Sequence, residues 1–256
     1  MDIGGVRCDW VRPRGVAAAH RIMVFLHGGG YVFGSPRTYR GLAARIAQRL
    51  DCVAVLPAYR QSPESPFPAA LQDATHVCTA LLSDDTYADN LLVVGSSSGG
   101  GLALSLAMSL RDGGTREPKA IGLLCPWLDL SLDIDGTRGA RRTDPVLSVG
   151  ILSNAARCYI ADGNPQDPLI SPIYGELGGL PPVVIVSASA DHCAADAARL
   201  ENRALEAGVK IYHKRIDGLW HDGLALSTWL TTARDGLDWT CLTLRRARDD
   251  SPVGPS

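Results

Sequence analysis

One serine of the chain lies in a pattern that is typical of a reactive hydroxyl. Residues 95–99 read Gly-Ser-Ser-Ser-Gly and fit G-x-S-x-G around Ser97, whereas neither neighbouring serine has glycines at both required offsets. The segment follows the apolar run 91–94 and precedes the apolar stretch 102–110. A serine held in a sharp turn between a strand and a helix is exposed for attack on a carbonyl carbon. A turn that only caps a helix is the alternative, and the flanking runs favour the nucleophile.

A serine hydroxyl needs a base, and the base needs a carboxylate that orients it. On a sheet of this kind the three residues follow in the order serine, acid, histidine. Of the histidines after Ser97, His213 falls inside a strand pattern and His192 adjoins the candidate acid, whereas His221 lies in a loop past the last predicted strand. We therefore predict that His221 is the base, against the alternative of a surface loop histidine.

Three aspartates are candidates for the acid. Asp191 follows the predicted strand 183–186 after a short loop, Asp196 falls within the next predicted helix, and Asp217 is a turn residue. The end of a strand is where an active-site carboxylate is expected, so Asp191 is the predicted acid. We expect its carboxylate to lie within about 3 Å of the His221 imidazole.

A glycine-rich loop, His-Gly-Gly-Gly-Tyr at 27–31, follows another apolar run. Glycines leave backbone N–H groups open to a ligand. With the N–H of Ser98, those of Gly28 and Gly29 are expected to bind the negative oxygen of a tetrahedral intermediate. Phosphate binding is the rival interpretation, but no Lys-Ser/Thr pair follows and the G-x-G-x-x-G spacing fails.

The elements that position these residues repeat along the chain as short apolar runs, each followed by a helix-like pattern. Near-continuous apolar strands separated by helices predict an α/β fold, with a mostly parallel sheet covered by helices on both faces. The predicted strands are Ile22 to Leu26, Val53 to Leu56, Leu91 to Val94, Ile121 to Leu124, Val183 to Val186 and Val209 to Ile216. The predicted helices begin near Ser35-Pro36, Pro68, Leu102 and Ala194, and the last of these ends at Gly208.

A long insertion, 131–180, interrupts this rhythm and contains one predicted helix near 148–160. Such an insertion is typical of a cap over a substrate site. No repeat or shift in composition marks a second domain, so 1–256 is expected to form a single domain, and the tail 249–256 is expected to be disordered. The residues expected to line the substrate pocket are Tyr31, Ser96, Leu147, Ile151 and Trp220.

Composition excludes several classes of function. The 25 Lys and Arg against 27 Asp and Glu give a net charge of −2, which offers no electrostatic footprint for nucleic acid. No apolar run approaches the roughly 18 residues of a membrane span, and no signal peptide opens the chain. The seven cysteines are scattered without a C-x-x-C pair, which predicts reduced thiols and neither a disulfide framework nor a zinc site. A cytoplasmic location is expected.

Several ordered motifs resemble one family. The chain is similar, over about residues 6–230, to the hormone-sensitive-lipase-like branch of α/β-hydrolases, in particular to bacterial acetyl hydrolases and monoterpene lactone hydrolases. The resemblance implies an α/β-hydrolase fold and hydrolysis of small carboxylic esters or lactones by Ser97, Asp191 and His221, without a metal or organic cofactor. It also implies that His27 braces the glycine loop, which Gly30 supports. The motifs are HGGGYVFGS (27–35), YRQSPESPFPAALQD (59–73), GSSSGGG (95–101), LCPWLDL (124–130), DPLISPIYGELGGLPPVVIVSASAD (167–191) and the loop around His221.

The chain departs from this family at a few positions. Ala58 replaces the usual Asp before Tyr-Arg, Ser96 replaces a frequent Asp beside the nucleophile, and Asp222 stands where an apolar residue is common. Members of the family carry further residues at the amino terminus. We therefore expect the first strand and the amino-terminal cap helices to be absent, and the insertion 131–180 to supply most of the pocket's cover.

Two other functions remain open. An amidase or deacetylase would use the same three residues, and the sequence does not separate it from an esterase. A non-catalytic binder of small ligands, similar to the gibberellin receptors of this fold, would have lost the catalytic histidine, so the presence of His221 argues against it. The expected partner is a small-molecule ester, lactone or amide, with no nucleic acid and no membrane insertion. A homodimer is compatible with these expectations.

Overall fold

The computed structural model describes residues 1–134 and 144–250. Its strands form one sheet in the order β1-β2-β4-β3-β5-β6-β7-β8. Strand β2 runs antiparallel to β1 and β4, and the remaining neighbours pair in parallel. The strands are β1 (Asp2–Ile3), β2 (Val6–Val11), β3 (Ile22–Leu26), β4 (Val53–Pro57), β5 (Leu91–Ser96), β6 (Ala120–Leu124), β7 (Val183–Ala188) and β8 (Ile211–Ile216).

The expectation that the first strand is absent is wrong. Strand β1 pairs with β2, and a turn at Gly4 and Gly5, both with positive φ, joins the two. In β2 the buried Val6 and Cys8 alternate with the exposed Arg7, which is the period of a half-buried strand. A strand of two residues is too short to show any period of its own. No helix precedes β2 among the described residues.

All of the predicted helices form, with bounds that differ by a few residues. The helices are α1 (Pro36–Leu50), α2 (Ala69–Leu82), α3 (Ser98–Asp112), α4 (Ser131–Ile134), α5 (Val149–Ile160), α6 (Ala194–Glu206) and α7 (Thr231–Asp249). Short 3₁₀ turns lie at Ala88–Asn90, Pro172–Tyr174 and Gly223–Leu226. Ser35 caps α1 and Ser148 caps α5 by accepting hydrogen bonds from backbone N–H groups.

Helix α7 was not predicted, and it corrects the expected tail. Asp249 is the last residue of α7, so the segment expected to be disordered does not begin there. Residues 251–256 of that segment lie outside the described part of the chain. None of the helices in the described ranges is long and apolar enough to cross a membrane. All seven cysteines carry free thiols, and six of them are buried.

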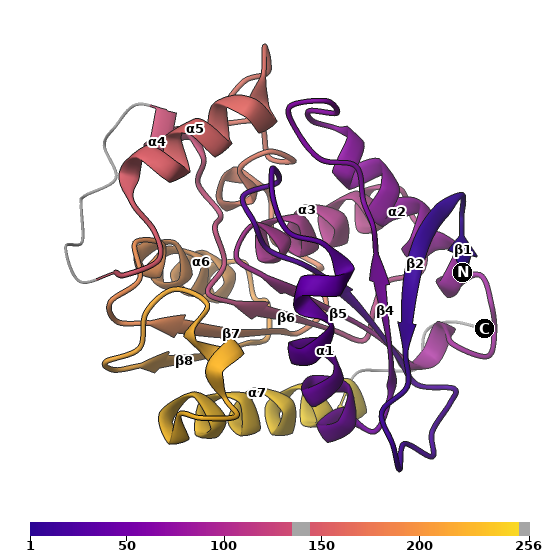
Figure 1. Ribbon diagram of the computed structural model, residues 1–256. Helices are drawn as coiled ribbons and strands as arrows, with labels where there is room; N and C mark the ends of the chain where they lie inside the picture. The colour runs from indigo at the N-terminus through magenta and orange to yellow at the C-terminus, as the bar shows by residue number, and fades with distance from the viewer. Residues whose placement is uncertain (135–143, 251–256) are drawn as a thin grey trace.

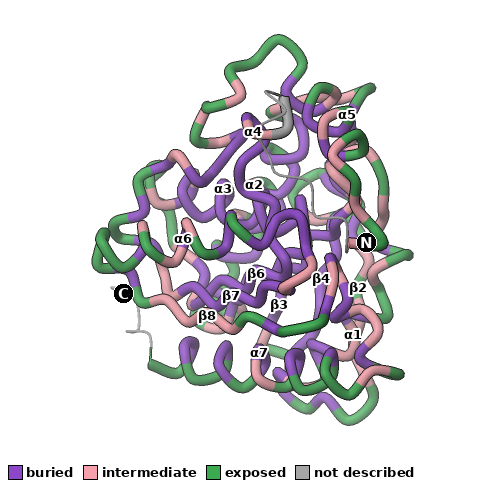
Figure 2. Tube along the Cα trace, turned by 90° about the vertical axis from the view of Figure 1, so that its left-hand side faces the viewer, coloured by how far each residue is buried: buried purple, intermediate pink, exposed green. Residues whose placement is uncertain are grey.

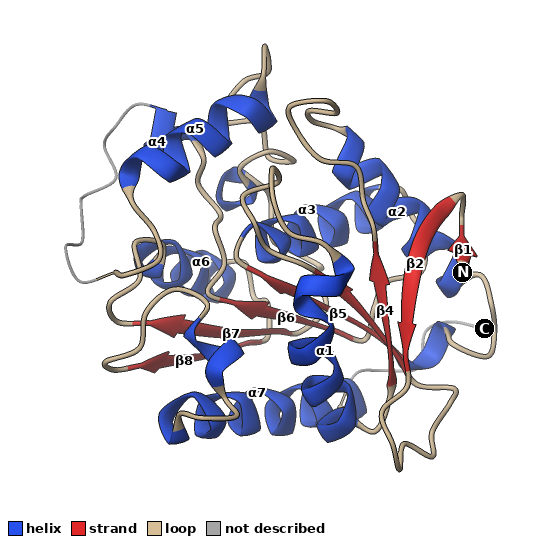
Figure 3. Ribbon diagram, viewed as in Figure 1, coloured by secondary structure: helices blue, strands red, loops and turns tan. Residues whose placement is uncertain are grey.

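The helices form two layers on the sheet. Helices α1 and α7 cover one face, and α2, α3 and α6 cover the other (Figure 1, Figure 3). Each layer packs on the apolar side chains that one face of the sheet presents to it. Strands β3 to β7 are buried at every residue, and Figure 2 shows the centre of the sheet buried along its length. This burial explains why their sequences are near-continuous apolar runs.

The carboxyl ends of β3, β5 and β7 meet at one edge of the sheet, because these strands are parallel. Helices α4 and α5 lie next to each other outside both helix layers (Figure 1). They belong to the insertion between β6 and β7. Tyr159 of α5 stacks on Tyr31 of the glycine loop, with ring centroids 3.6 Å apart and planes 6° from parallel. A Cβ at Gly30 would lie 2.9 Å from the Cβ of Ala155. Helix α5 therefore packs directly on the glycine loop.

Tyr159 provides a test of this packing. Its hydroxyl is buried and has no hydrogen-bond partner among the described residues. An unsatisfied buried hydroxyl costs about 1–3 kcal/mol. We expect Tyr159→Phe to keep the stack and to raise the free energy of unfolding, or leave it unchanged, in urea titrations. Tyr159→Ala, which removes the ring, should lower it by about 3–5 kcal/mol. A clear loss of stability in Tyr159→Phe would show that the hydroxyl has a partner.

Candidate active site

The backbone at Ser97 forms a strained turn between β5 and α3. Ser97 has φ 55° and ψ −121°, a conformation that non-glycine residues rarely adopt. A Cβ at Gly95 would lie 1.9 Å from the carbonyl oxygen of Gly99, and a Cβ at Gly99 would lie 2.1 Å from that of Leu26. Both glycines of the pattern are therefore required. The Ser97 side chain makes no capping hydrogen bond to α3, which argues against a turn that only caps the helix.

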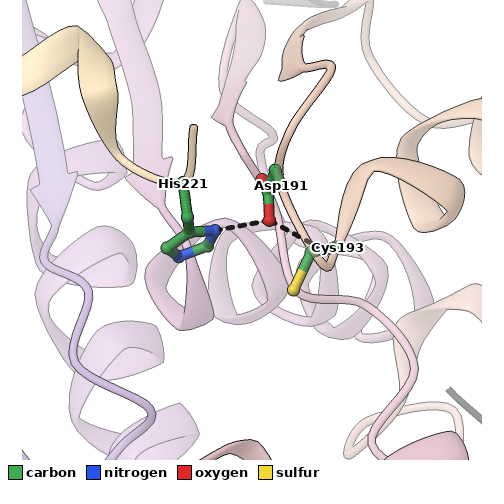
Figure 4. A group of neighbouring side chains, drawn as sticks. All are labelled: Asp191, Cys193 and His221. Carbon is green, nitrogen blue, oxygen red and sulfur yellow. Dashed lines mark hydrogen bonds and ion pairs between the residues drawn. The ribbon is translucent and has the colours of Figure 1, made fainter. Parts of the chain in front are cut away.

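Three predicted residues from three separate loops form one hydrogen-bonded row. The Ser97 Oγ lies 2.7 Å from Nε2 of His221, and Nδ1 of the same ring lies 2.9 Å from Oδ1 of Asp191. Figure 4 shows the carboxylate of Asp191 directed at the imidazole. Oδ1 also accepts a hydrogen bond of 2.7 Å from the Cys193 backbone N–H. Their exposed fractions are 6% for Ser97, 2% for His221 and 0% for Asp191, so the row is almost fully shielded from water.

The other candidate acids lie elsewhere. Asp196 is buried in α6, and its carboxylate accepts hydrogen bonds from the backbone N–H groups of Leu128 and Asp129. Asp217 is exposed and pairs with Arg215 at 3.7 Å. The first has a structural role and the second faces solvent, so Asp191 is the carboxylate that the structure brings to His221.

His213 belongs to a second hydrogen-bonded row that resembles the first. Its Nε2 lies 2.7 Å from the Ser187 Oγ, and its Nδ1 lies 2.8 Å from Glu201. Ser187 is inside strand β7 and 1% exposed, so it lacks the turn that presents Ser97. The backbone N–H of the remaining candidate, His192, donates to the Asp144 carboxylate of the insertion at 3.1 Å.

The electrostatic environment of His221 favours its protonated form. Burial lowers the pKa of the imidazole, but the carboxylates of Asp191, Asp222 and Asp144 outweigh burial and raise the pKa to about 9. Asp191 has the largest of these effects, first through its charge and then through the Nδ1–H hydrogen bond that it accepts. The environment therefore stabilises the imidazolium that forms when the histidine takes a proton.

His27 braces the glycine loop. Burial lowers the pKa of its imidazole to about 4, so the ring is neutral near pH 7. Its Nδ1 donates to the Gly28 carbonyl at 2.9 Å, and the Tyr59 hydroxyl donates to the His27 carbonyl at 2.7 Å. The two rings stack with centroids 4.2 Å apart. These contacts fix the start of the loop.

The glycine loop adjoins the serine. A Cβ at Gly28 would lie 3.1 Å from the Ser97 Cβ and 2.5 Å from the Tyr39 hydroxyl oxygen. The Gly28 N–H interacts with that hydroxyl and opposes the effect of burial, which raises the Tyr39 pKa. Across the described residues, the backbone N–H groups of Gly29, Gly30 and Ser98 have no hydrogen-bond acceptor. They are available to an anionic ligand.

Some of the residues predicted to line a pocket lie in the interior. Tyr31 and Ser96 are each 1% exposed; Tyr31 stacks on Tyr159 and Ser96 bonds to Asp222. The side chains of Tyr31 and Ser96 therefore contact other parts of the protein. Residue type alone, aromatic for one and polar for the other, does not predict that they are buried. Leu147 and Trp220 are half-buried, and Ile151 is 47% exposed.

Sequence reasoning did not single out two residues that act on the site, Tyr39 and Asp144. They lie in α1 and in the insertion, far along the chain from His221, and carry no local motif.

One group near the site has side chains that metal ions bind. Ligand atoms of Asp191, Cys193 and His221 all lie within 4.8 Å of one another and are buried (Figure 4). The Asp191 and His221 atoms in question are joined by a hydrogen bond. A cation would have to displace the proton between them, so the arrangement suits proton transfer better than metal binding.

Comparison with known proteins agrees with this fold. Residues 23–225 match the family described as alpha/beta hydrolase fold. The chain is 40% identical over 237 residues to LipR of Mycobacterium tuberculosis, to which acetyl-hydrolase activity is ascribed, covering 93% of this chain and 76% of that protein. It is 34% identical over 221 residues to an acetyl-hydrolase of Streptomyces hygroscopicus, covering 86% and 73%. The crystal structure of EstE5 soaked with p-nitrophenyl butyrate superposes with a TM-score of 0.90 at 30% identity, covering 97% and 84%.

These matches define the class of the protein. The chain belongs to the α/β-hydrolase fold family, in the branch that resembles hormone-sensitive lipase. It is an enzyme of the carboxylesterase class.

The raised pKa of His221 predicts a pH dependence. A general base must be neutral, and its folded pKa lies above the ordinary 6.5, at about 9. Activity is therefore expected to fall as the pH decreases through this pKa, and the acid limb of kcat/KM should lie above pH 6.5. The limb is located by measuring kcat/KM for the hydrolysis of a p-nitrophenyl ester between pH 5 and 10 at constant ionic strength. A plateau extending down to pH 6 would contradict the assignment of His221 as a base in this environment.

Proposed function

We propose that the chain hydrolyses small carboxylic esters through a covalent acyl-enzyme, with Ser97 as nucleophile, His221 as general base and acid, and Asp191 as the orienting carboxylate. The observation that carries the proposal is the row of hydrogen bonds, 2.7 Å and 2.9 Å long, that joins the three side chains. The positive φ of Ser97 supports it, because strain of this kind persists at functional sites.

The geometry supports a two-step reaction. Nε2 of His221 takes the proton of Ser97 as Oγ attacks the ester carbonyl carbon, and the carbonyl oxygen becomes negative. His221 then gives its proton to the alcohol oxygen as the carbon–oxygen bond breaks, and the acyl group remains on Oγ. In the second step His221 takes a proton from the water that attacks the acyl carbonyl carbon. His221 then gives this proton to Ser97 Oγ as the bond between the acyl carbon and Oγ breaks, and the carboxylic acid leaves. Asp191 holds Nδ1–H throughout and stabilises the imidazolium.

The negative oxygen of the intermediate requires hydrogen-bond donors. The predicted set was Gly28, Gly29 and Ser98. Gly28 already interacts with the Tyr39 hydroxyl, whereas Gly30 has a free N–H. We therefore assign the donors to Gly29, Gly30 and Ser98, which removes Gly28 from the set. Ser98 contributes from the first turn of α3, where the helix dipole also favours negative charge.

The relatives support ester substrates with short acyl groups. Two are named for acetyl hydrolysis, and one structure was determined after soaking with a butyrate ester. A lactone is a cyclic ester and would react by the same steps. No contact in the described residues favours an amide, which needs stronger protonation of its leaving group. A non-catalytic binder would not need the hydrogen-bonded row of Ser97, His221 and Asp191.

Ser97→Ala tests the nucleophile. The variant should retain the fold and lose about 10³-fold to 10⁶-fold in kcat, since the oxyanion donors and binding remain. Ser187→Ala is the matched control, because Ser187 also bonds to a histidine but sits inside a strand. It should keep activity near that of the parent. Retention of more than a tenth of the parent kcat in Ser97→Ala would refute the assignment.

The length of the acyl chain that the enzyme prefers tests how far the insertion encloses the proposed site. Leu147 and Ile151 of the insertion are exposed or half-buried and would contact an acyl chain only along one side. Full burial contributes about 0.8 kcal/mol per CH₂, and one-sided contact contributes less. We expect kcat/KM to peak at acyl chains of about two to six carbons and to fall beyond about ten, measured with p-nitrophenyl esters below their critical micelle concentrations. A continuous rise to long chains would mean that the insertion encloses a deep acyl tunnel.

A further inference from the structure

Asp222, the residue after the proposed base, joins the histidine loop to two other segments. Its Oδ1 accepts a 2.5 Å hydrogen bond from Ser96 Oγ, beside the nucleophile. Its Oδ2 accepts a 2.8 Å hydrogen bond from the Tyr39 hydroxyl of α1. These partners are 126 and 183 residues away in the chain. Both oxygens of the carboxylate are therefore used to hold segments that meet only in the folded protein.

Tyr39 extends this connection to the glycine loop. Its hydroxyl oxygen would lie 2.5 Å from a Cβ at Gly28, and it interacts with the Gly28 N–H. Its ring stacks beside that of His27, with centroids 6.1 Å apart. One carboxylate thus links the loops that carry the proposed base, the nucleophile and the oxyanion donors.

The backbone at Asp222 suits this role. The residue has φ 55° and ψ 14°, the left-handed helical region. Aspartate and asparagine tolerate this region better than most residues with a side chain. Asparagine is therefore a substitution that removes the charge without adding backbone strain.

We propose that Asp222 is a positioning residue for His221, whose carboxylate fastens the histidine loop to the nucleophile turn through Ser96 and to the glycine loop through Tyr39. Ser96 and Asp222 then form a single feature. Ser96 supplies the hydroxyl donor beside the nucleophile, and the carboxylate that accepts its hydrogen bond comes from the opposite loop at position 222. This inference rests on the proposed catalytic role of His221.

The charge of Asp222 has its own effect on the base. The charged groups that act on His221 are Asp191, Asp222 and Asp144. Two neighbouring groups stay protonated and neutral: the Cys125 thiol, whose pKa is raised by burial and by the carboxylates of Asp191 and Asp222, and the hydroxyl of Tyr39. Loss of the Asp222 charge would leave the imidazolium less stabilised, so His221 would become neutral at lower pH.

Two single variants separate position from charge. Asp222→Ala removes both hydrogen bonds and should lower kcat by about 10-fold to 100-fold with little change in KM, because a base displaced by a fraction of an ångström transfers its proton poorly. Asp222→Asn keeps a side chain that can bond to Ser96 and Tyr39 but has no charge. It should lose less activity and shift the acid limb of kcat/KM to lower pH by about 0.5 to 1 unit.

A double variant and a control complete the test. The double variant Ser96→Asp/Asp222→Asn places the carboxylate at position 96 and the neutral partner at position 222. The negative charge near His221 is thereby restored, so the acid limb of kcat/KM should return toward that of the parent. Asp217→Asn removes a negative charge from the same loop, but its carboxylate is 92% exposed and pairs only at 3.7 Å with Arg215, so kcat and the limb should not change. Far-ultraviolet circular dichroism and the melting temperature establish that each variant is folded.

The outcomes distinguish this inference from the proposed function. If Asp222→Ala and Asp222→Asn keep the parent kcat and acid limb while Ser97→Ala is inactive, Asp222 has no positioning role and the esterase mechanism stands. If Asp222→Ala does not fold, the inference is still tested by the acid limb of kcat/KM. This limb should shift in Asp222→Asn and return toward that of the parent in the double variant. An unshifted limb in Asp222→Asn refutes the charge effect, and equal losses of kcat in Asp222→Asn and Asp217→Asn would refute the specific contact.

Discussion

The positive φ of Ser97 is the constraint on which the site depends. A non-glycine residue in such a region costs about 1–3 kcal/mol, which the surrounding packing must supply. The Ser97 N–H donates to the Leu124 carbonyl at the end of β6, and its own carbonyl accepts from Trp127. Gly95 and Gly99 give the room for this turn, since side chains there would collide with backbone. The buried centre of the sheet therefore fixes the direction in which the hydroxyl points.

Burial sets the strength of the electrostatic interactions around that hydroxyl. Asp191 is fully buried, and its Oδ2 has no hydrogen-bond partner among the described residues. A carboxylate with few donors remains a strong acceptor, because little else disperses its charge in a medium of low dielectric constant. Its interaction with His221, together with the charges of Asp222 and Asp144, outweighs the desolvation of the imidazole, which explains why the pKa of the histidine rises instead of falling. In the proposed mechanism, this environment would therefore stabilise the imidazolium that forms when His221 takes the proton of Ser97.

Local patterns predicted most of the fold and part of the site. Runs of apolar residues located β3 to β7, and chain order with strand ends selected Ser97, Asp191 and His221. The first strand was missed because two residues show no periodicity. Helix α7 was missed because small and polar residues, among them Gly236, Thr240 and Thr243, occupy much of its buried face and weaken the apolar pattern. Tyr31 and Ser96 were assigned to a pocket by type, but neighbours distant in the chain bury them. The Tyr39 contact to Asp222 spans 183 residues and has no local sequence signal.

The insertion contacts the candidate site at two places. Tyr159 and Ala155 of α5 pack on the glycine loop, and Asp144 accepts a hydrogen bond from the backbone beside Asp191. The same Asp144 charge raises the pKa of His221. A displacement of the insertion would therefore both remove packing from the glycine loop and lower the pKa of His221.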